Sequence, residues 1–193
     1  MTEPCVPAAI IGGLALLERA VNYTLGSVRL VTPDAMNRET PCRDWDVRAL
    51  LAHLGDSIEA LHEAVAAGWV GLDATAADPE ADPVAAVRDR ARRLLGACTG
   101  AGGHDLVAVA GAPVTTGLVT GAGAIEVAVH GWDVARACGQ RRPIPDDLGA
   151  RLLELAPLLV GDADRPGRFD PPVDVPPLAR PADRLVAFLG RRP

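Results

Sequence analysis

Apolar residues recur at intervals of three and four along several long stretches of this chain, and that spacing constrains the fold more than any other feature. The first stretch covers residues 8–30 and carries one apolar stripe made of Ile10, Leu14, Leu17, Val21, Leu25 and Val28. Such spacing is typical of an amphipathic helix with one face toward a core. The sequence therefore predicts a long first helix, which the segment around Pro33 ends.

Three further stretches show the same helical spacing. The second begins after Asp44 or Asp46, either of which can cap a helix, and the others cover residues 84–98 and 123–138. Residues 105–110 fit either an irregular loop or a short strand. Four amphipathic helices with no strong strand favour an all-α fold built as a four-helix bundle.

The part of the chain after Gly139 has a different character. It predicts one helix at 146–159, then a proline-rich coil, and a short helix at 181–189. The prolines favour an extended strap that lies over the bundle, with Phe169 and Phe188 as its anchors.

Charge and hydropathy exclude several classes of function. The net charge is −6, and the 19 basic residues are all arginines scattered in ones and twos, which argues against a nucleic-acid partner. The apolar start of the chain lacks the basic residues of a signal peptide, and glycines and Pro113 interrupt the uncharged stretch 106–125. We expect a soluble cytoplasmic protein that acts on a small-molecule substrate and has no membrane partner. A homodimer is compatible with the sequence.

The four cysteines carry no recognisable motif. They are far apart in the sequence and form no paired metal-binding or redox spacing: Cys5, Cys42, Cys98 and Cys138. We expect buried or half-buried thiols without a catalytic role.

Histidine is scarce, so the positions of the histidines are informative. Glu126 and His130 are four residues apart in the fourth predicted helix and share one of its faces. His53 lies in the second predicted helix, whereas His62, nine residues later, falls on the opposite side of that helix. Side chains from facing helices can converge on a metal in the core of a bundle. The spacing alone also fits an ordinary hydrogen-bonded core histidine.

Other polar residues are candidates for proton transfer or for orienting a ligand. Asp133 follows His130 by three residues and can accept a hydrogen bond from its imidazole, unless it is solvated. Asp56 and Ser57 lie three and four residues beyond His53. By helical position, Asp133, Asp56 and Ser57 are the candidate general acids or bases.

Two segments resemble a known family. The segment TPCRDWDVRALLAHL, residues 40–54, is similar to the opening of the second helix in the DinB-like family, whose named member is mycothiol-dependent maleylpyruvate isomerase. The segment EVAVHGWDVARACG, residues 126–139, resembles the fourth helix of that family. The two segments occur in the right order and at the right separation.

This resemblance implies a fold, a metal site and a domain organisation. It implies a DinB-like four-helix bundle over residues 1–140, with a divalent metal held by His53, Glu126 and His130. Residues 141–193 would then form a helix and a strap packed on the bundle, as in stand-alone actinobacterial members known as metal-binding proteins. The isomerase has a second, α/β domain that this segment is too short and too proline-rich to encode, so maleylpyruvate isomerisation is not implied.

Three protein ligands leave coordination positions open, as catalytic zinc sites do. The family resemblance favours Zn²⁺, with Ni²⁺ or Fe²⁺ as alternatives, and mycothiol or a similar thiol as cosubstrate. Such an enzyme would transfer or add a thiol to an electrophile, or isomerise a small metabolite. Two histidines and one carboxylate also match non-haem iron enzymes. A non-catalytic protein that binds a metal or a small molecule is the third hypothesis.

Trp45 and Trp132 fit either a pocket wall or ordinary packing.

Overall fold

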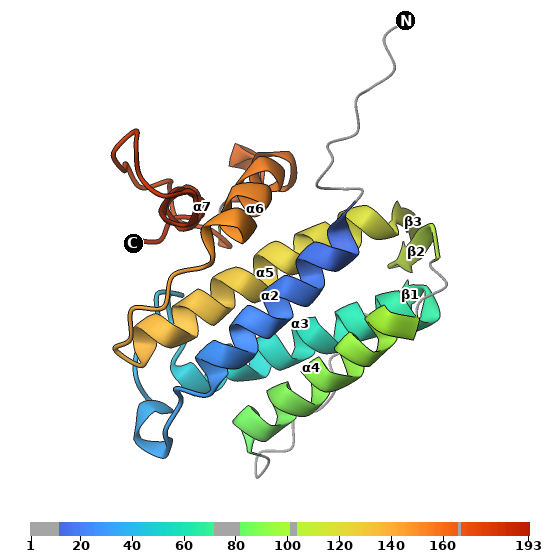
Figure 1. The fold of residues 1–193 in the computed structure, drawn as a ribbon, viewed down its shortest axis with the longest axis horizontal. Coiled ribbons are helices and arrows are strands. Elements are labelled where there is room, and N and C mark those ends of the chain that lie inside the picture. The colour runs from blue at the N-terminus through green and yellow to red at the C-terminus, as the bar shows by residue number, and fades with distance from the viewer. Residues whose placement is uncertain (1–11, 72–81, 101–103, 166) are drawn as a thin grey trace, which may run out of the picture.

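The computed structural model describes residues 12–71, 82–100, 104–165 and 167–193. Four long helices pack against one another in this part of the chain (Figure 1): α2 (Gly13–Val28), α3 (Val47–Ala67), α4 (Pro83–Gly100) and α5 (Thr116–Ala137). Helix α2 contacts α5 and α4, and α3 contacts the same two helices. The protein is mostly helical, as the periodicity predicts.

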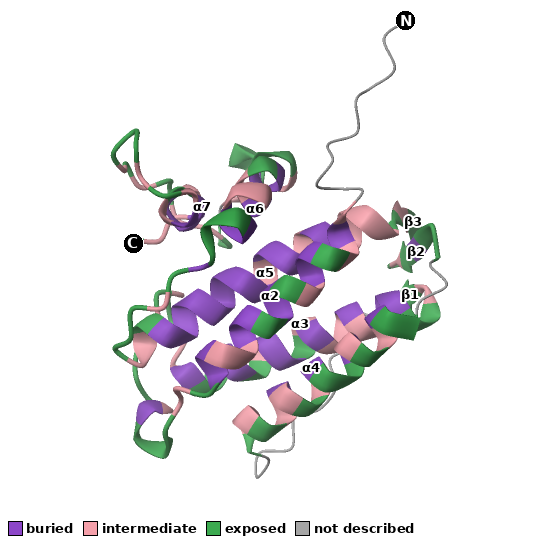
Figure 2. Cartoon of the chain, in the orientation of Figure 1, coloured by how far each residue is buried: buried purple, intermediate pink, exposed green. Residues whose placement is uncertain are grey.

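The helical stripes form one apolar core. Buried and exposed residues alternate along α2, α3 and α4, whereas α5 is buried along most of its length (Figure 2). Leu17 of α2, Leu54 of α3 and Leu94 of α4 are fully buried in this core. Burial of such side chains from each helix supplies the main favourable free energy of folding.

A small sheet accompanies the mostly helical fold. It consists of three short strands in the order β1 (Trp69–Val70), β2 (Leu106–Val109) and β3 (Ala112–Thr115), with β1 parallel and β3 antiparallel to β2. Ala110 and Gly111 join β2 to β3, and both have positive φ angles, 49° and 80°. A two-residue turn of this kind matches the twist of paired strands. The sheet lies where α3 ends and α5 begins, because β1 follows α3 and β3 precedes α5 in the chain.

Helix α5 begins at Thr116, earlier than the predicted start at residue 123. Its first turns are rich in glycine and threonine, which have low helix propensity and therefore suggested a loop. The structure explains these small residues by close packing. A Cβ atom on Gly123 would lie 2.3 Å from Leu61 Cδ2, and one on Gly13 of α2 would lie 2.6 Å from the carbonyl oxygen of Gly117. Tertiary contacts outweigh local propensity here.

The C-terminal segment packs beside the long helices. Helix α6 (Asp146–Leu159) contacts α7 (Pro181–Phe188), α5 and α2, and lies on the outer side of α5 in Figure 1. Phe169 and Phe188 pack against the core, as the sequence predicts. The short 3₁₀ helices η1 (Pro33–Ala35) and η2 (Asp162–Asp164) complete the described elements. No helix in the described residues is both long enough and apolar enough to cross a membrane.

The single tyrosine of the chain provides a test of this packing. Tyr23 of α2 is 5% exposed and donates a hydrogen bond to the carbonyl oxygen of Arg142 at 2.6 Å. Burial raises the pKa of Tyr23 from its ordinary value of 10.0 to about 12. Tyrosinate absorbance at 295 nm should therefore appear about two pH units later in the folded protein than in the unfolded protein.

This shift has a consequence for stability. The unfolded chain loses the Tyr23 proton first, so the stabilisation is complete below pH 10 and is lost as the pH rises toward 12. The loss should total roughly 2–3 kcal/mol of unfolding free energy. Urea unfolding at several alkaline pH values measures it, with Tyr23→Phe as the control that lacks this dependence. A folded protein that forms tyrosinate near pH 10 would contradict the prediction.

Candidate metal centre

A short loop places two side chains at the start of α3. The side chain of Asp46 caps α3 by accepting a hydrogen bond from the Ala49 amide at 2.8 Å, so Asp46 rather than Asp44 is the capping residue. The hydroxyl of Thr40 donates to the carbonyl oxygen of Trp45 at 2.9 Å and accepts from the Cys42 amide at 3.1 Å. These bonds fix Cys42 and Trp45 beside the first turns of α3.

Three side chains from α3 and α5 meet across the helix interface. His53 Nε2 lies 2.6 Å from Glu126 Oε1, and His130 Nε2 lies 3.1 Å from the same oxygen. The three donor atoms all lie within 4.8 Å of one another. The structure thus brings together His53, Glu126 and His130, the three residues that the family resemblance implied as ligands.

The three side chains of the cluster differ in their exposure to solvent. The side chains of His53 and Glu126 are 37% and 35% exposed, whereas that of His130 is 8% exposed. The half-buried ring of Trp45 lies against His53 with the ring centroids 4.6 Å apart, and its centroid is 6.2 Å from that of His130. Trp45 therefore walls the cluster, while Trp132 is buried and stacks with Arg136.

The other nitrogen of His130 contacts a second group of polar side chains. His130 Nδ1 lies 3.1 Å from Asp133 Oδ2, and Cys42 Sγ lies 3.6 Å from the same nitrogen. The Cys42 thiol donates to Asp133 Oδ2 at 3.2 Å. Arg191 donates to both Asp133 oxygens, from Nη2 to Oδ2 at 3.0 Å and from Nε to Oδ1 at 3.4 Å. The His130 imidazole thus joins two polar clusters.

The electrostatics of these groups are dominated by their neighbours. Burial by itself would raise the pKa of Glu126, but His130 and His53 hold it well below its usual range. Burial would lower the pKa of His130, but hydrogen bonds to Asp133, Cys42 and Glu126 raise it well above its usual value. Asp133 has a lowered pKa because His130 and Arg191 outweigh the effect of its burial. Both carboxylates are therefore ionised at neutral pH.

The candidate acids and bases are placed in three different ways. Ser57 is close to the cluster and donates to Glu126 Oε1 at 3.3 Å. Asp133 is fully buried behind His130, where it can orient the imidazole but has no access to a substrate. Asp56 is exposed and pairs with Arg90 of α4 at 3.5 Å, with no contact to the cluster. His62 lies outside the cluster and contacts Glu59 at 3.6 Å, as its helical position predicts.

Sequence reasoning missed two members of this site. It assigned no role to Cys42, although the residue lies within the segment that resembles the family. Cys42 is half-buried, as expected, and it contacts His130 and Asp133. No sequence pattern singles out Arg191, because it is 58 residues from Asp133 in the sequence and only folding brings the two together. Cys98 is buried and Cys138 is half-buried, as expected, and Cys5 lies outside the described residues.

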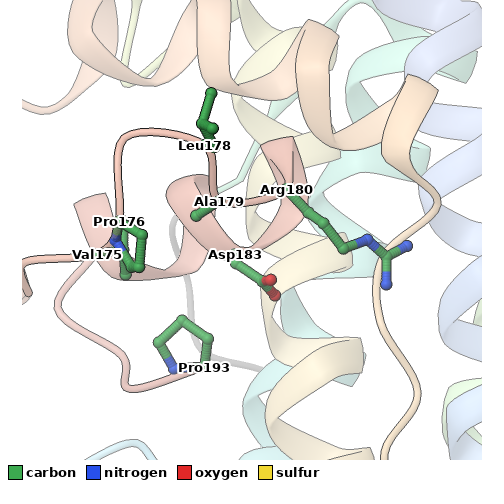
Figure 3. A pocket seen from close by; sticks show the side chains of 7 residues that line it. All are labelled: Val175, Pro176, Leu178, Ala179, Arg180, Asp183 and Pro193. Carbon is green, nitrogen blue, oxygen red and sulfur yellow. The ribbon is translucent and has the colours of Figure 1, made fainter.

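A hollow of about 500 Å³ lies elsewhere, in the C-terminal segment (Figure 3). Val175, Pro176 and Pro193 line it together with Asp183 and Arg180. It shares no residue with the histidine cluster and contains no histidine or cysteine. The Arg180 guanidinium pairs with Asp146 at 3.1 Å. This hollow lacks the convergent polar groups that a chemical site needs.

The donor set of the histidine cluster fits a divalent metal. Two imidazole nitrogens, which lose their protons when the metal binds, and one carboxylate oxygen are the ligands that catalytic zinc sites use, at about 2.0–2.2 Å from the ion. The donor atoms are close enough for a single ion to contact all three after small side-chain movements. Asp133 behind His130 also provides the carboxylate–histidine arrangement that commonly supports a bound metal.

Comparison with known proteins identifies the family. The mycothiol maleylpyruvate isomerase N-terminal domain family matches residues 17–135, more than half of the chain. Two uncharacterized proteins of Mycobacterium tuberculosis, from strains CDC 1551 and H37Rv, are each 31% identical over 188 residues, covering 90% of this chain and 94% of the relative. No solved structure matches the chain significantly. The chain therefore belongs to the mycothiol maleylpyruvate isomerase N-terminal domain family.

Proposed function

We propose that this protein is a divalent-metal-dependent enzyme that activates a small thiol for reaction with an electrophile. The observation that carries the proposal is the cluster of His53, Glu126 and His130, with its donor atoms converging and one side open to solvent. In this reading residues 1–140 form a DinB-like four-helix bundle that contains the site. The family match over residues 17–135 supports that division, with residues 141–193 packed on the bundle.

Each residue of the site has a defined part in this proposal. His53, Glu126 and His130 would hold the metal, and Zn²⁺ suits two imidazoles and a carboxylate. A bound zinc ion would lower the pKa of a thiol or of water, so that a nucleophile exists at neutral pH. The Ser57 hydroxyl, 3.3 Å from Glu126 Oε1, orients that carboxylate. Trp45 excludes water from the side of the imidazoles that it covers.

The substrate class is inferred from the exposure of the site and from the family. The half-exposed edges of His53 and Glu126 give access to a small molecule, and the family favours mycothiol or a similar thiol as cosubstrate. The thiol proton would leave to solvent as the sulfur attacks one carbon of an electrophilic double bond, and a proton from solvent would add to the neighbouring carbon as the π bond breaks. The product is either a thiol adduct or, after the thiol is released again, an isomer.

The ligand set also fits a second candidate function. Two histidines and one carboxylate match mononuclear iron enzymes, and the donor atoms here meet that requirement as well as they meet that of zinc. A site that binds metal without catalysis is the third candidate. Metal identity and thiol dependence distinguish these three candidates.

Metal analysis of purified protein is the first test. We expect about one zinc per chain in protein made without nickel affinity purification, and loss of that zinc in His53→Ala and His130→Ala. His62→Ala is the matched control, because His62 is on the same helix as His53 but outside the cluster. Thiol-dependent consumption of an electrophile should follow the zinc content. Iron in place of zinc would favour the second candidate, and no metal in the wild-type protein would overturn the proposal.

A further inference from the structure

We infer that Arg191 is a positioning residue for the metal centre, acting through Asp133 to hold the His130 imidazole in the direction that a metal ligand requires. The inference rests on the metal site proposed above and extends it to a residue of the C-terminal segment. Neither the family match, which ends at residue 135, nor the ligand motif includes Arg191.

The contacts of Arg191 are those of a fixed group and not of a surface arginine. Its side chain is 10% exposed, and its guanidinium spans both oxygens of Asp133 at 3.0 and 3.4 Å. Nη1 donates to the carbonyl oxygen of Leu189 at 2.9 Å, and Nη2 also contacts Cys42 Sγ at 3.4 Å. A planar guanidinium that bonds both oxygens of a carboxylate fixes its orientation as well as its charge.

The backbone around Arg191 is fixed as well. Gly190 has a φ of 85°, and the amide of Arg191 donates to the carbonyl oxygen of Val186 at 2.9 Å, which closes the end of α7. A Cβ atom on Gly190 would lie 2.7 Å from the carbonyl oxygen of Asp170, so this turn requires glycine. The turn directs Arg191 from the end of α7 toward α5.

Asp133 connects Arg191 to the His130 imidazole. Its Oδ2 atom, which accepts from Arg191, lies 3.1 Å from His130 Nδ1. The two nitrogens of an imidazole face different sides of the ring, so a partner on Nδ1 sets the direction of Nε2. His130 Nε2 then lies 3.1 Å from Glu126 Oε1, inside the proposed ligand set. Without Arg191, Asp133 would keep only His130 and Cys42 as partners and would be held less firmly beside the imidazole.

Zinc affinity of two neighbouring arginine variants tests the inference. Competition with a chromophoric chelator at fixed pH gives the zinc Kd of Arg191→Gln, and we expect it to be about 10- to 100-fold weaker than that of the wild-type protein. Arg192→Gln is the matched control, because Arg192 is the next residue and is exposed, and it should bind zinc within twofold of the wild type. Arg191→Lys, which keeps the charge but not the two-point contact, should restore part of the affinity.

A double variant tests whether Arg191 acts through Asp133. Asp133→Asn should weaken zinc binding by itself, and addition of Arg191→Gln to it should cause little further loss. The double variant leaves no unpaired buried charge, so it also decides the question if Arg191→Gln alone does not fold. An unchanged zinc Kd in Arg191→Gln, or an equal loss with and without Asp133, would overturn this inference while the metal site stands. Failure of the wild-type protein to bind zinc would overturn both.

Discussion

Zinc at a thousand times its Kd is expected to raise the free energy of unfolding of the metal-free protein by about 4 kcal/mol, because a ligand that binds the folded state stabilises it by mass action. The site exists only in the folded chain, since His53 lies on α3 and the other two proposed ligands lie on α5. Urea unfolding with and without a buffered zinc concentration measures the increase.

The Glu126→Gln variant should lose most of this zinc-dependent stabilisation. If about 10 kcal/mol of binding free energy is shared by three ligands, the loss of one costs roughly 3 kcal/mol, or more than a hundredfold in affinity. At the same free zinc concentration the increase should then fall to about 1 kcal/mol. His62→Ala, which changes a histidine outside the cluster, should keep the full increase. An equal zinc-dependent increase in the free energy of unfolding in Glu126→Gln and the wild type would show that zinc binds elsewhere.

Replacement of Asp133 by alanine should destabilise the metal-free protein by about 3–5 kcal/mol. Asp133 is fully buried, and its carboxylate is the shared partner of Arg191, His130 and the Cys42 thiol. Removal of one side of a buried ion pair leaves the other charge without compensation. Chemical denaturation of the protein after chelation of metal gives the change directly.

Two control variants separate the buried charge from the general cost of removing an aspartate. Asp56→Ala removes an exposed carboxylate whose contact with Arg90 is on the surface, so it should cost less than about 1 kcal/mol. The double variant Asp133→Ala/Arg191→Met removes both charges and should be more stable than Asp133→Ala alone. A loss in Asp133→Ala no larger than that in Asp56→Ala would show that the buried pair contributes little.

The sheet and the start of α5 show where sequence patterns were insufficient. Ala108 and Val109 pair with Trp69 and Val70, and no local pattern reports a pairing partner that is tens of residues away. The glycines at the start of α5 have low helix propensity, yet neighbouring helices need their small size to approach closely. At the start of α5 long-range packing therefore outweighs the local preference.

The sequence by itself indicated the long helices, and its resemblance to the family named the three candidate ligands. Apolar spacing fixes which face of a helix is buried, and the four-residue interval between Glu126 and His130 puts both on one face whatever the helix packs against. The pairing of His53 with Glu126, the wall that Trp45 provides and the burial of Asp133 depend on how α3, α5 and the loop before α3 meet. Only the tertiary structure decided the places of Cys42 and Arg191, because distances between residues remote in sequence depend on packing and are not set by local periodicity.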